Sequence, residues 1–268
     1  MPKLKAFLKR DWELAFISPV SLLFETGQTL AYFLSFFFIG KLLGSGGVPD
    51  ALAPYGGDYF RFVLVGITFS LFMTTALHSV SRTLDFERSH GTLEAILLTP
   101  TSFTSLALSK AGWDFGGVIV KSTLYLIAGA LLFHVRLNTG QWLPAAIAMT
   151  LTTLIFLGLG LISAGLTLLL REANPLESVL GWISRFFAGV YFPIAVLPSS
   201  LRKFAAWLPF TDALEAVRHS LIQGIPGGFV KGELLELFGF SAALLPVGIL
   251  FFEWAFKRAR RQGRLGFS

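Results

Sequence analysis

Long apolar segments constrain this chain more than any other feature of its sequence. Several runs exceed the roughly 18–20 residues that a helix needs to cross about 30 Å of hydrocarbon. Backbone polar groups in hydrocarbon must pair within their own segment, so we expect these runs to be helices. We place six spans, at residues 20–43, 60–81, 111–134, 144–170, 177–197 and 234–256. The sequence therefore predicts an all-α polytopic membrane protein with one transmembrane domain over residues 1–268, of which residues 20–256 hold the six spans.

The charge content agrees with a bilayer environment. Only 14% of the residues are charged and 54% are hydrophobic, whereas about a quarter of the residues in soluble domains are charged. The net charge is +6, but the basic residues lie beside the apolar runs, so we interpret them as juxtamembrane anchors rather than a nucleic-acid surface. The absence of cysteine excludes disulfides and thiolate metal sites. We expect no metal site in this chain.

Both ends of the chain are basic. Residues 1–18 carry apolar and basic side chains at helical spacing, which predicts a helix lying in the membrane interface, although an ordinary helical lead-in also fits. Residues 257–268 form a basic tail. Most Lys and Arg residues fall on the side that carries both ends, so we predict that both termini are cytoplasmic. No cleavable signal peptide is evident.

Two connecting segments are more than simple loops. The cytoplasmic segment 81–109 contains a short amphipathic helix pattern. The outer segment 193–231 is apolar and punctuated by prolines, so we predict a re-entrant helical hairpin between the fifth and sixth spans. Within it, Asp212 and Glu215 have the spacing of a capping box, and Gly224 can end the helix. Its candidate residues are Trp207, Pro209, Glu215 and Arg218.

Small residues four apart recur in two spans and permit close helix contact. They are Gly112 and Gly116 in the third span, and Gly160 and Ala164 in the fourth. Such pairs are also common in apolar helices that make no close contact.

The two connecting segments also carry a family resemblance. The stretch ERSHGTLEAILLTP, from Glu87 to Pro100, resembles the cytoplasmic loop of the ABC type-2 permeases. The stretch GVYFP at 189–193, followed by Leu208-Pro209-Phe210-Thr211 and Glu215-Ala216-Val217-Arg218, is similar to the segment after that family's fifth span. With the interfacial helix, six spans and basic tail, the resemblance covers nearly the whole chain.

The resemblance implies a function as the transmembrane subunit of an exporter in the bacterial inner membrane. Two six-span permeases, here expected as a homodimer, form the transmembrane unit, and two separate ATP-binding cassette ATPase subunits bind below them. ATP and Mg belong to those partner subunits. Substrate passes outward between the permeases, and family substrates include lipid-linked glycans, lipids, drugs and other amphipaths.

The resemblance assigns the cytoplasmic helix the role of a coupling helix. Leu93, Ile96 and Leu97 form an apolar face for docking on the ATPase, and Gly91 allows a tight turn before the helix. The full set of expected docking residues is Glu87, Arg88, Gly91, Thr92, Leu93, Glu94, Ile96 and Leu97. The alternative is an amphipathic helix that packs on the chain's own spans. The Gly-rich stretch 44–47 lacks the spacing of a phosphate-binding loop, so this chain has no nucleotide site of its own.

Aromatic residues are dense in the first and fifth spans, which in the resembled family flank the pathway. Our candidates for a pathway or gate are Tyr32, Phe33, Phe36, Phe37, Phe187, Tyr191, Phe192 and Pro193. Tyr191 and Phe192 are the strongest, because Pro193 is expected to break the helix there. Packing or lipid-facing roles are the alternative for each ring.

Three charged residues fall within the predicted spans. They are Glu25, Lys121 and Arg185. A charge in the bilayer usually faces protein or water. We hypothesise that Glu25 and Arg185 pair, because they have similar depth and opposite charge.

The sequence thus favours an exporter subunit driven by a partner ATPase, and not an enzyme. A secondary transporter or channel without an ATPase partner would need membrane-buried carboxylates or inverted repeats. A membrane-embedded enzyme would need a catalytic constellation, and four scattered histidines do not make one.

Overall fold

The computed structural model describes residues 19–45, 50–92, 103–170, 175–225 and 231–262. Within these ranges the chain is helical and contains no strand. The expected interfacial helix at 1–18 lies outside the described residues, as does the tail beyond residue 262.

Four helices are long and apolar enough to cross a membrane. They are α3 (Tyr59–Ser89), α5 (Phe103–Leu132), α6 (Trp142–Leu170) and α10 (Lys231–Arg261). Length and composition thus confirm the second, third, fourth and sixth expected spans as helices of the required kind. The first expected span corresponds to α2 (Pro19–Ser45), and the fifth begins with the shorter α7 (Pro175–Phe187).

The fifth span differs from the sequence prediction. The expected segment 177–197 becomes a helix that ends at Phe187, and 13 residues rise only about 20 Å. Gly189 ends the helix, with a φ of 71°, and the amide of Val190 donates to the carbonyl of Arg185 at 3.3 Å. This is the left-handed C-terminal cap that glycine favours. Pro193 lies beyond that turn, so the expectation that Pro193 breaks the helix was wrong.

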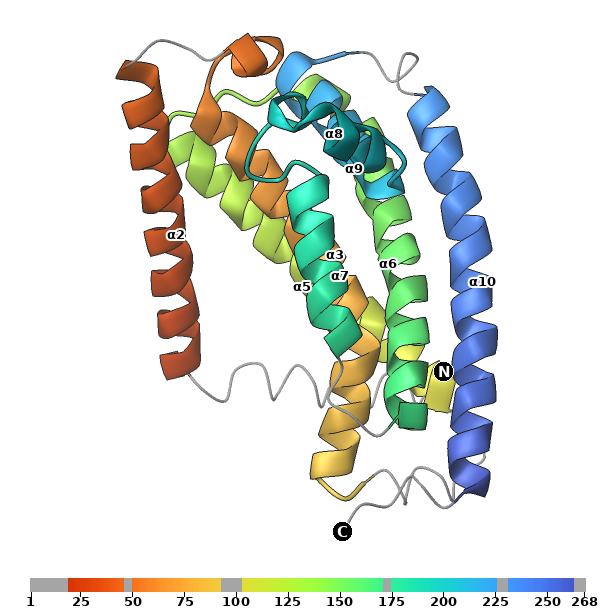
Figure 1. The fold of residues 1–268 in the computed structure, drawn as a ribbon. Helices are drawn as coiled ribbons and strands as arrows, with labels where there is room; N and C mark the ends of the chain where they lie inside the picture. The colour runs from red at the N-terminus through yellow and green to blue at the C-terminus, as the bar shows by residue number, and fades with distance from the viewer. Residues whose placement is uncertain (1–18, 46–49, 93–102, 171–174, 226–230, 263–268) are drawn as a thin grey trace.

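A hairpin of short helices follows α7 and caps one end of the molecule (Figure 1). It consists of η3 (Ile194–Val196), α8 (Ser199–Ala206), α9 (Pro209–Arg218) and the π-helical turn η4 (His219–Gln223). The same end, called the hairpin end below, carries η1 (Asp50–Tyr55) and η2 (Thr139–Gln141), and α3 and α10 begin there.

The termini of α9 and η4 bear on the predicted cap residues. Pro209 is the first helical residue of α9 and Leu208 its N-cap. Asp212 therefore lies inside the helix and is not the N-cap of a capping box, because proline's fixed φ suits the first helical position and starts the helix earlier. Gly224 caps η4 with a φ of 68°, as predicted.

Helix α3 is the central column of the fold. It packs against α2, α5, α6, α7 and α9, and 78% of its most apolar window is buried. In contrast, only 17% of the corresponding windows of α5 and α10 are buried. The outer helices therefore leave more apolar surface exposed to the surroundings of the molecule than α3 does.

Glycine sets the closest helix crossings. A Cβ on Gly160 of α6 would lie 2.4 Å from the carbonyl oxygen of Leu77 on α3, so the predicted close contact in the fourth span is confirmed. A Cβ on Gly248 of α10 would lie 2.4 Å from the carbonyl oxygen of Gly158. Gly112 and Gly116 of α5 behave differently, because a Cβ there would meet no heavy atom within 4 Å. The expectation of close contact in the third span was therefore wrong for the described residues.

Candidate functional site

A buried arginine lies where the hairpin meets the central column. The side chain of Arg218 on α9 is fully buried. Its Nη2 donates to the carbonyl oxygen of Gly189 at 2.8 Å, and its Nη1 donates to Glu215 Oε1 at 3.2 Å. The guanidinium carbon lies 3.5 Å from the centre of the Phe62 ring. A buried charge persists only with such partners, so Arg218 ties α9 to α3 and to the turn after α7.

Glu215 extends this link to a further element. The hydroxyl of Tyr55 in η1 donates to Glu215 Oε2 at 2.8 Å. Burial lowers the pKa of Arg218 to about 10, and the nearby Glu215 opposes that shift. The guanidinium is therefore charged at neutral pH. Burial raises the pKa of Tyr55, and Glu215 raises it further. The tyrosine thus keeps its proton and can donate it to the carboxylate.

Three more hydrogen bonds fix the hairpin. Arg61 Nη2 on α3 donates to the carbonyl oxygen of Ile222 at 2.6 Å. The amide of Asn138 donates to the carbonyl oxygen of Leu221 at 2.8 Å. Thr211 Oγ1 donates to the carbonyl oxygen of Phe187 at 3.3 Å. The hairpin is therefore attached to α3, to the segment before η2 and to the end of α7.

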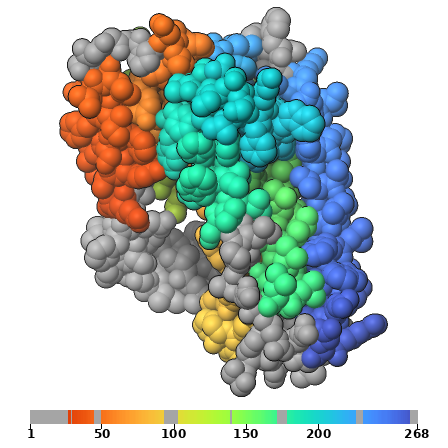
Figure 2. Space-filling view, viewed as in Figure 1, coloured from red at the N-terminus to blue at the C-terminus, as the bar shows by residue number. Residues whose placement is uncertain are grey.

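An aromatic contact joins α2 to the turn after α7. The hydroxyls of Tyr32 and Tyr191 lie 3.1 Å apart within hydrogen-bonding distance. The rings of Phe36 and Tyr191 stack with their centres 5.8 Å apart. Figure 2 shows the surface hollowed between α2 and α7 on this face. Three of the eight expected pathway residues therefore meet at one point, which we call the tyrosine contact.

The other aromatic candidates lie elsewhere. Phe33 is 2% exposed and packs edge-on against Tyr125 of α5, with ring centres 5.0 Å apart. Phe37 packs against Phe60 and Phe133. These two side chains form a core between α2, α3 and α5, so packing accounts for them.

The remaining candidates line the hairpin side of α7. The rings of Phe187 and Phe204 meet edge to face at 5.0 Å, and those of Phe192 and Phe186 at 5.1 Å. Pro193 is buried and precedes η3. These residues hold the turn after α7 against the hairpin.

The expected coupling segment begins on α3 itself. Glu87 and Arg88 occupy the last helical turn, and Glu87 is 1% exposed. Gly91 has a φ of 67°, and the hydroxyl of Thr92 donates to the Glu87 carboxylate. The predicted tight turn at Gly91 is thus present. Leu93, Glu94, Ile96 and Leu97 lie outside the described residues, so the predicted docking face stays a prediction.

Two of the three predicted intramembrane charges, Lys121 and Arg185, have side chains in the described part of the structure. Arg185 Nε donates to the carbonyl oxygen of Gly181 on its own helix at 3.0 Å, and Lys121 is partly exposed on α5. The side chain of Glu25 lies outside the described part of the structure, so its pairing with Arg185 stays a hypothesis. Trp207, from the expected hairpin set, is 85% exposed and marks the outer surface of the hairpin.

Acidic side chains gather where the hairpin faces the start of α10. His219 Nδ1 lies 3.5 Å from Glu233 Oε1, and this hydrogen bond raises the pKa of His219. Burial raises the pKa of Asp212 to about 6, with Glu236, Glu233 and Glu215 adding to the effect. No group of three or more His, Cys, Asp or Glu side chains in the described ranges could hold a metal ion.

The partners of Arg218 were not identified from the sequence. Tyr55, Phe62 and Gly66 all surround it, and a Cβ on Gly66 would lie 2.4 Å from the carbonyl oxygen of Val190. One sequence signal was available: an arginine in an apolar hairpin needs a counter-ion, and Glu215 lies one helical turn away. Tyr55 and Gly66 have no comparable local signal.

Comparison with known proteins adds one match. A protein-family model described as ABC-2 type transporter matches residues 2–222 of the chain. No curated protein matches the chain.

Proposed function

Since the chain belongs to the ABC-2 type transporter family, we propose that it moves an amphipathic or lipid-linked substrate outward, using energy from a separate ATPase subunit. The family match makes it a multi-pass membrane protein and a permease subunit of an ABC transporter. Members of this family are generally not catalytic themselves and normally work with an ATP-binding subunit. The substrate class of glycan, lipid or drug and the outward direction belong to our proposal.

The observation that carries the proposal is the continuity of α3. This 31-residue helix is about 46 Å long, and it joins the turn at Gly91 to the buried Arg218 at the hairpin end. Its central burial places it in contact with most other helices. A displacement applied at the Gly91 turn would therefore reach the hairpin and the tyrosine contact through one stiff element.

We further propose a dimer of two permease chains, each bound to one ATPase subunit that holds ATP and Mg. The faces of α2 and α7 near the tyrosine contact support this arrangement, because apolar side chains are exposed on both. Examples are Leu30 and Phe38 on α2, and Trp182 on α7, whose exposed fractions are 45%, 62% and 61%. A second copy would cover such a face.

The proposed orientation has both termini and the Gly91 turn in the cytoplasm of a bacterium, with the chain in the inner membrane and the hairpin end outside. The basic end of α10, with Arg258, Arg260 and Arg261 in its last turn, supports this orientation.

Co-purification tests the ATPase partner. The tagged chain is purified from its native cells, and Mg-dependent ATP hydrolysis is measured in the eluate. Placing charge on the expected docking face, with Ile96→Asp and Leu97→Asp, should remove most of the recovered hydrolysis. The matched control Glu253→Gln changes an exposed ion pair near the end of α10 and should leave recovery unchanged. Equal recovery from the docking variant, or transport by the chain alone without ATP, would contradict the proposal.

The tyrosine contact is tested as a gate. Tyr191→Ala removes both the hydroxyl contact with Tyr32 and the stack on Phe36, so vesicles that contain this variant should leak carboxyfluorescein faster than wild type. Phe192→Ala should have a similar effect. Phe238→Ala alters an exposed ring on α10 and serves as the control. Unchanged leak in both the Tyr191→Ala and the Phe192→Ala variants would remove the gate from the proposal.

The alternative function is a secondary transporter or channel that works without an ATPase. The family match favours the ATP-driven reading, and the co-purification experiment separates the two.

A further inference from the structure

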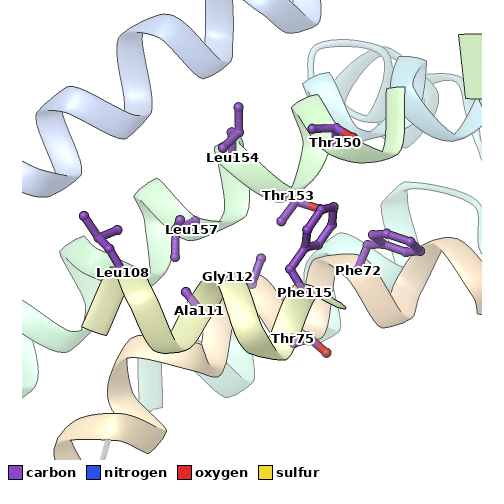
Figure 3. A pocket seen from close by; sticks show the side chains of 11 residues that line it. Phe72, Thr75, Leu108, Ala111, Gly112, Phe115, Thr150, Thr153, Leu154 and Leu157 are labelled. Carbon is purple, nitrogen blue, oxygen red and sulfur yellow. The ribbon is translucent and has the colours of Figure 1, made fainter. Parts of the chain in front are cut away.

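A cavity of about 150 Å³ lies between α3, α5 and α6 (Figure 3). Its lining includes Phe72 and Ala76 from α3, Gly112 and Phe115 from α5, and Thr153 and Leu157 from α6. Figure 3 shows residues of the three helices around the cavity, with the ring of Phe115 reaching from α5 towards α6.

The cavity lies where α5 and α6 face each other without packing closely. Both helices pack along α3, but they barely contact one another. Gly112 adds to the space, since a Cβ at this position would meet no heavy atom within 4 Å. Protein interiors rarely leave such volume empty, so we expect a molecule to fill this wedge, the space between α5 and α6.

The chemistry of the lining residues favours a hydrocarbon ligand. Most lining side chains are apolar. The hydroxyls of Thr150 and Thr153 donate at 2.8 Å to the carbonyl oxygens of Ala146 and Met149 on their own helix. A buried water needs two to four polar partners, and these two hydroxyls, whose protons are already donated along their own helix, can offer it acceptor lone pairs only. An apolar cavity of this size in other proteins stays dry and takes small apolar molecules.

The depth of the cavity along α3 indicates which kind of hydrocarbon can reach it. Phe72 and Ala76 lie midway along α3, which begins at Tyr59 and ends at Ser89, about 20 Å from either end. Lipid headgroups do not reach this depth, whereas acyl chains do. The neighbouring surface of α5 is exposed and apolar, with Val120 and Leu124 each more than half exposed, so lipid tails adjoin the opening.

We propose that this cavity binds one acyl chain of a bilayer phospholipid, held between α5 and α6. The proposal depends on the chain's place in a membrane and not on the direction or substrate of transport. The bound acyl chain fills the wedge and holds α5 and α6 at a fixed separation on α3.

Photolabelling with phospholipid tests the site. The full chain is reconstituted in phosphatidylcholine vesicles that contain a small share of phosphatidylcholine with a diazirine in the middle of one acyl chain. After irradiation, labelled peptides are mapped by mass spectrometry. Labels should concentrate on residues 108–115 and 150–157, above the level on the outer face of α5. A diazirine placed beside the headgroup should not label these residues. Both measurements use the unaltered protein.

A matched pair of variants sharpens the test. Gly112→Phe fills the cavity and should lose most of the label on residues 150–157, and the smaller Gly112→Leu should lose part of it. Gly116→Phe lies one helical turn away, where a Cβ also meets no heavy atom within 4 Å, but Gly116 does not line the cavity. This control should keep the label.

Three outcomes would overturn the proposal. The first is labelling spread evenly over the exposed face of α5, and the second is labelling unchanged by both Gly112 variants. The third is an efficient disulfide between two copies of Gly112→Cys, which carries the only thiol in a chain without natural cysteine. Such a cross-link would assign the cavity to a second copy instead.

Discussion

Among the contacts that the structure describes, different kinds stand out at the two ends of this helical bundle. At the hairpin end, hydrogen bonds join residues far apart in the sequence, such as Tyr55 with Glu215 and Arg61 with Ile222. At the opposite end, where α3 and α10 finish, an apolar cluster joins α3, α5, α6 and α10. Its buried members include Leu84, Phe103, Leu161 and Phe252.

Directional and non-directional contacts have different mechanical consequences. A hydrogen bond onto a backbone carbonyl weakens steeply when its angle or length changes, so the hairpin end keeps one register. Apolar contacts have no preferred direction, so helices in the opposite cluster can shift while they stay buried. If a partner ATPase drives the chain as proposed, we expect the apolar end to adjust to that ATPase and the hairpin end to move as one unit.

The largest expected effect comes from removing the buried charge at the hairpin end. Arg218→Met keeps an unbranched side chain but loses the bonds to Gly189 and Glu215 and leaves the Glu215 carboxylate without its cation. Breaking a buried ion pair typically costs about 3–5 kcal/mol. The free energy of unfolding, measured by SDS titration in mixed micelles, should fall by that amount.

The matched control for this variant is Lys203→Met, which changes an exposed cation of the same hairpin. It should stay within about 0.5 kcal/mol of wild type. If both variants lost equal stability, the hairpin end would not depend on directional bonds and the comparison would fail.

A smaller effect is expected where the turn after α7 touches α3. Alanine normally favours a helix over glycine by about 1 kcal/mol, so Gly117→Ala on the exposed side of α5 should be neutral or stabilising. At Gly66 the added Cβ would lie 2.4 Å from the carbonyl oxygen of Val190. We expect Gly66→Ala to destabilise by about 1–3 kcal/mol, as overpacking generally does. The same titration compares the two variants, and a stabilising Gly66→Ala would show that the contact can relax.

A weaker effect should mark the apolar cluster at the opposite end. Leu161 is fully buried there, and Leu161→Met conserves volume. Swaps of this kind usually cost less than about 1.5 kcal/mol, because neighbouring side chains can repack. Circular dichroism melting and the SDS titration should agree on this small loss. A loss as large as that of Arg218→Met would mean that the apolar end is equally specific in its geometry, which would remove the contrast.

Hydropathy predicted which segments span the membrane, but not whether each helix is covered by protein or by lipid. The best windows of α3 and α5 have the same mean hydropathy of 1.7, yet 78% of the first and 17% of the second is buried. In a bilayer, lipid and protein are both apolar, so hydropathy does not say which one a helix meets. Gly112 illustrates the limit, because its spacing with Gly116 predicts a helix contact and the structure has open space there.

The candidate site was predictable only where the requirement was local. The turn at Gly91 and the cap at Gly224 follow from the need for a positive φ. The tyrosine contact joins Tyr32 to Tyr191, which lie far apart in the sequence. The residues beside each tyrosine give no sign of that pairing. Phe33, Phe36 and Phe37 are all phenylalanines of α2, yet Phe33 and Phe37 pack on Tyr125 and Phe60 whereas Phe36 stacks on Tyr191. The phase of the helix relative to α3 decides which ring meets which neighbour.

The smallest expected effect is a pH dependence confined to the hairpin end. Burial raises the pKa of Asp212 to about 6, and Glu236, Glu233 and Glu215 add to the shift. The folded protein therefore holds the proton more tightly than the unfolded chain, whose Asp pKa is about 3.9. Stability should be greatest below about pH 4 and fall as the pH rises to about 6, by about 1 kcal/mol after solvent screening.

Asp212→Asn isolates this contribution from that of its neighbour. His219, whose pKa is raised by its hydrogen bond to Glu233, also loses stabilisation as the pH rises, but above its ordinary value near 6.5. The Asn variant should therefore flatten the curve of stability against pH between about pH 4 and 6. It should still lose stability above about pH 6, because His219 still titrates. Asp50→Asn, an exposed carboxylate of the same end, should leave the curve unchanged. Parallel curves for wild type and Asp212→Asn would mean that water reaches this carboxylate, and that the hairpin end is less tightly closed against α10 than its bonds to α3 imply.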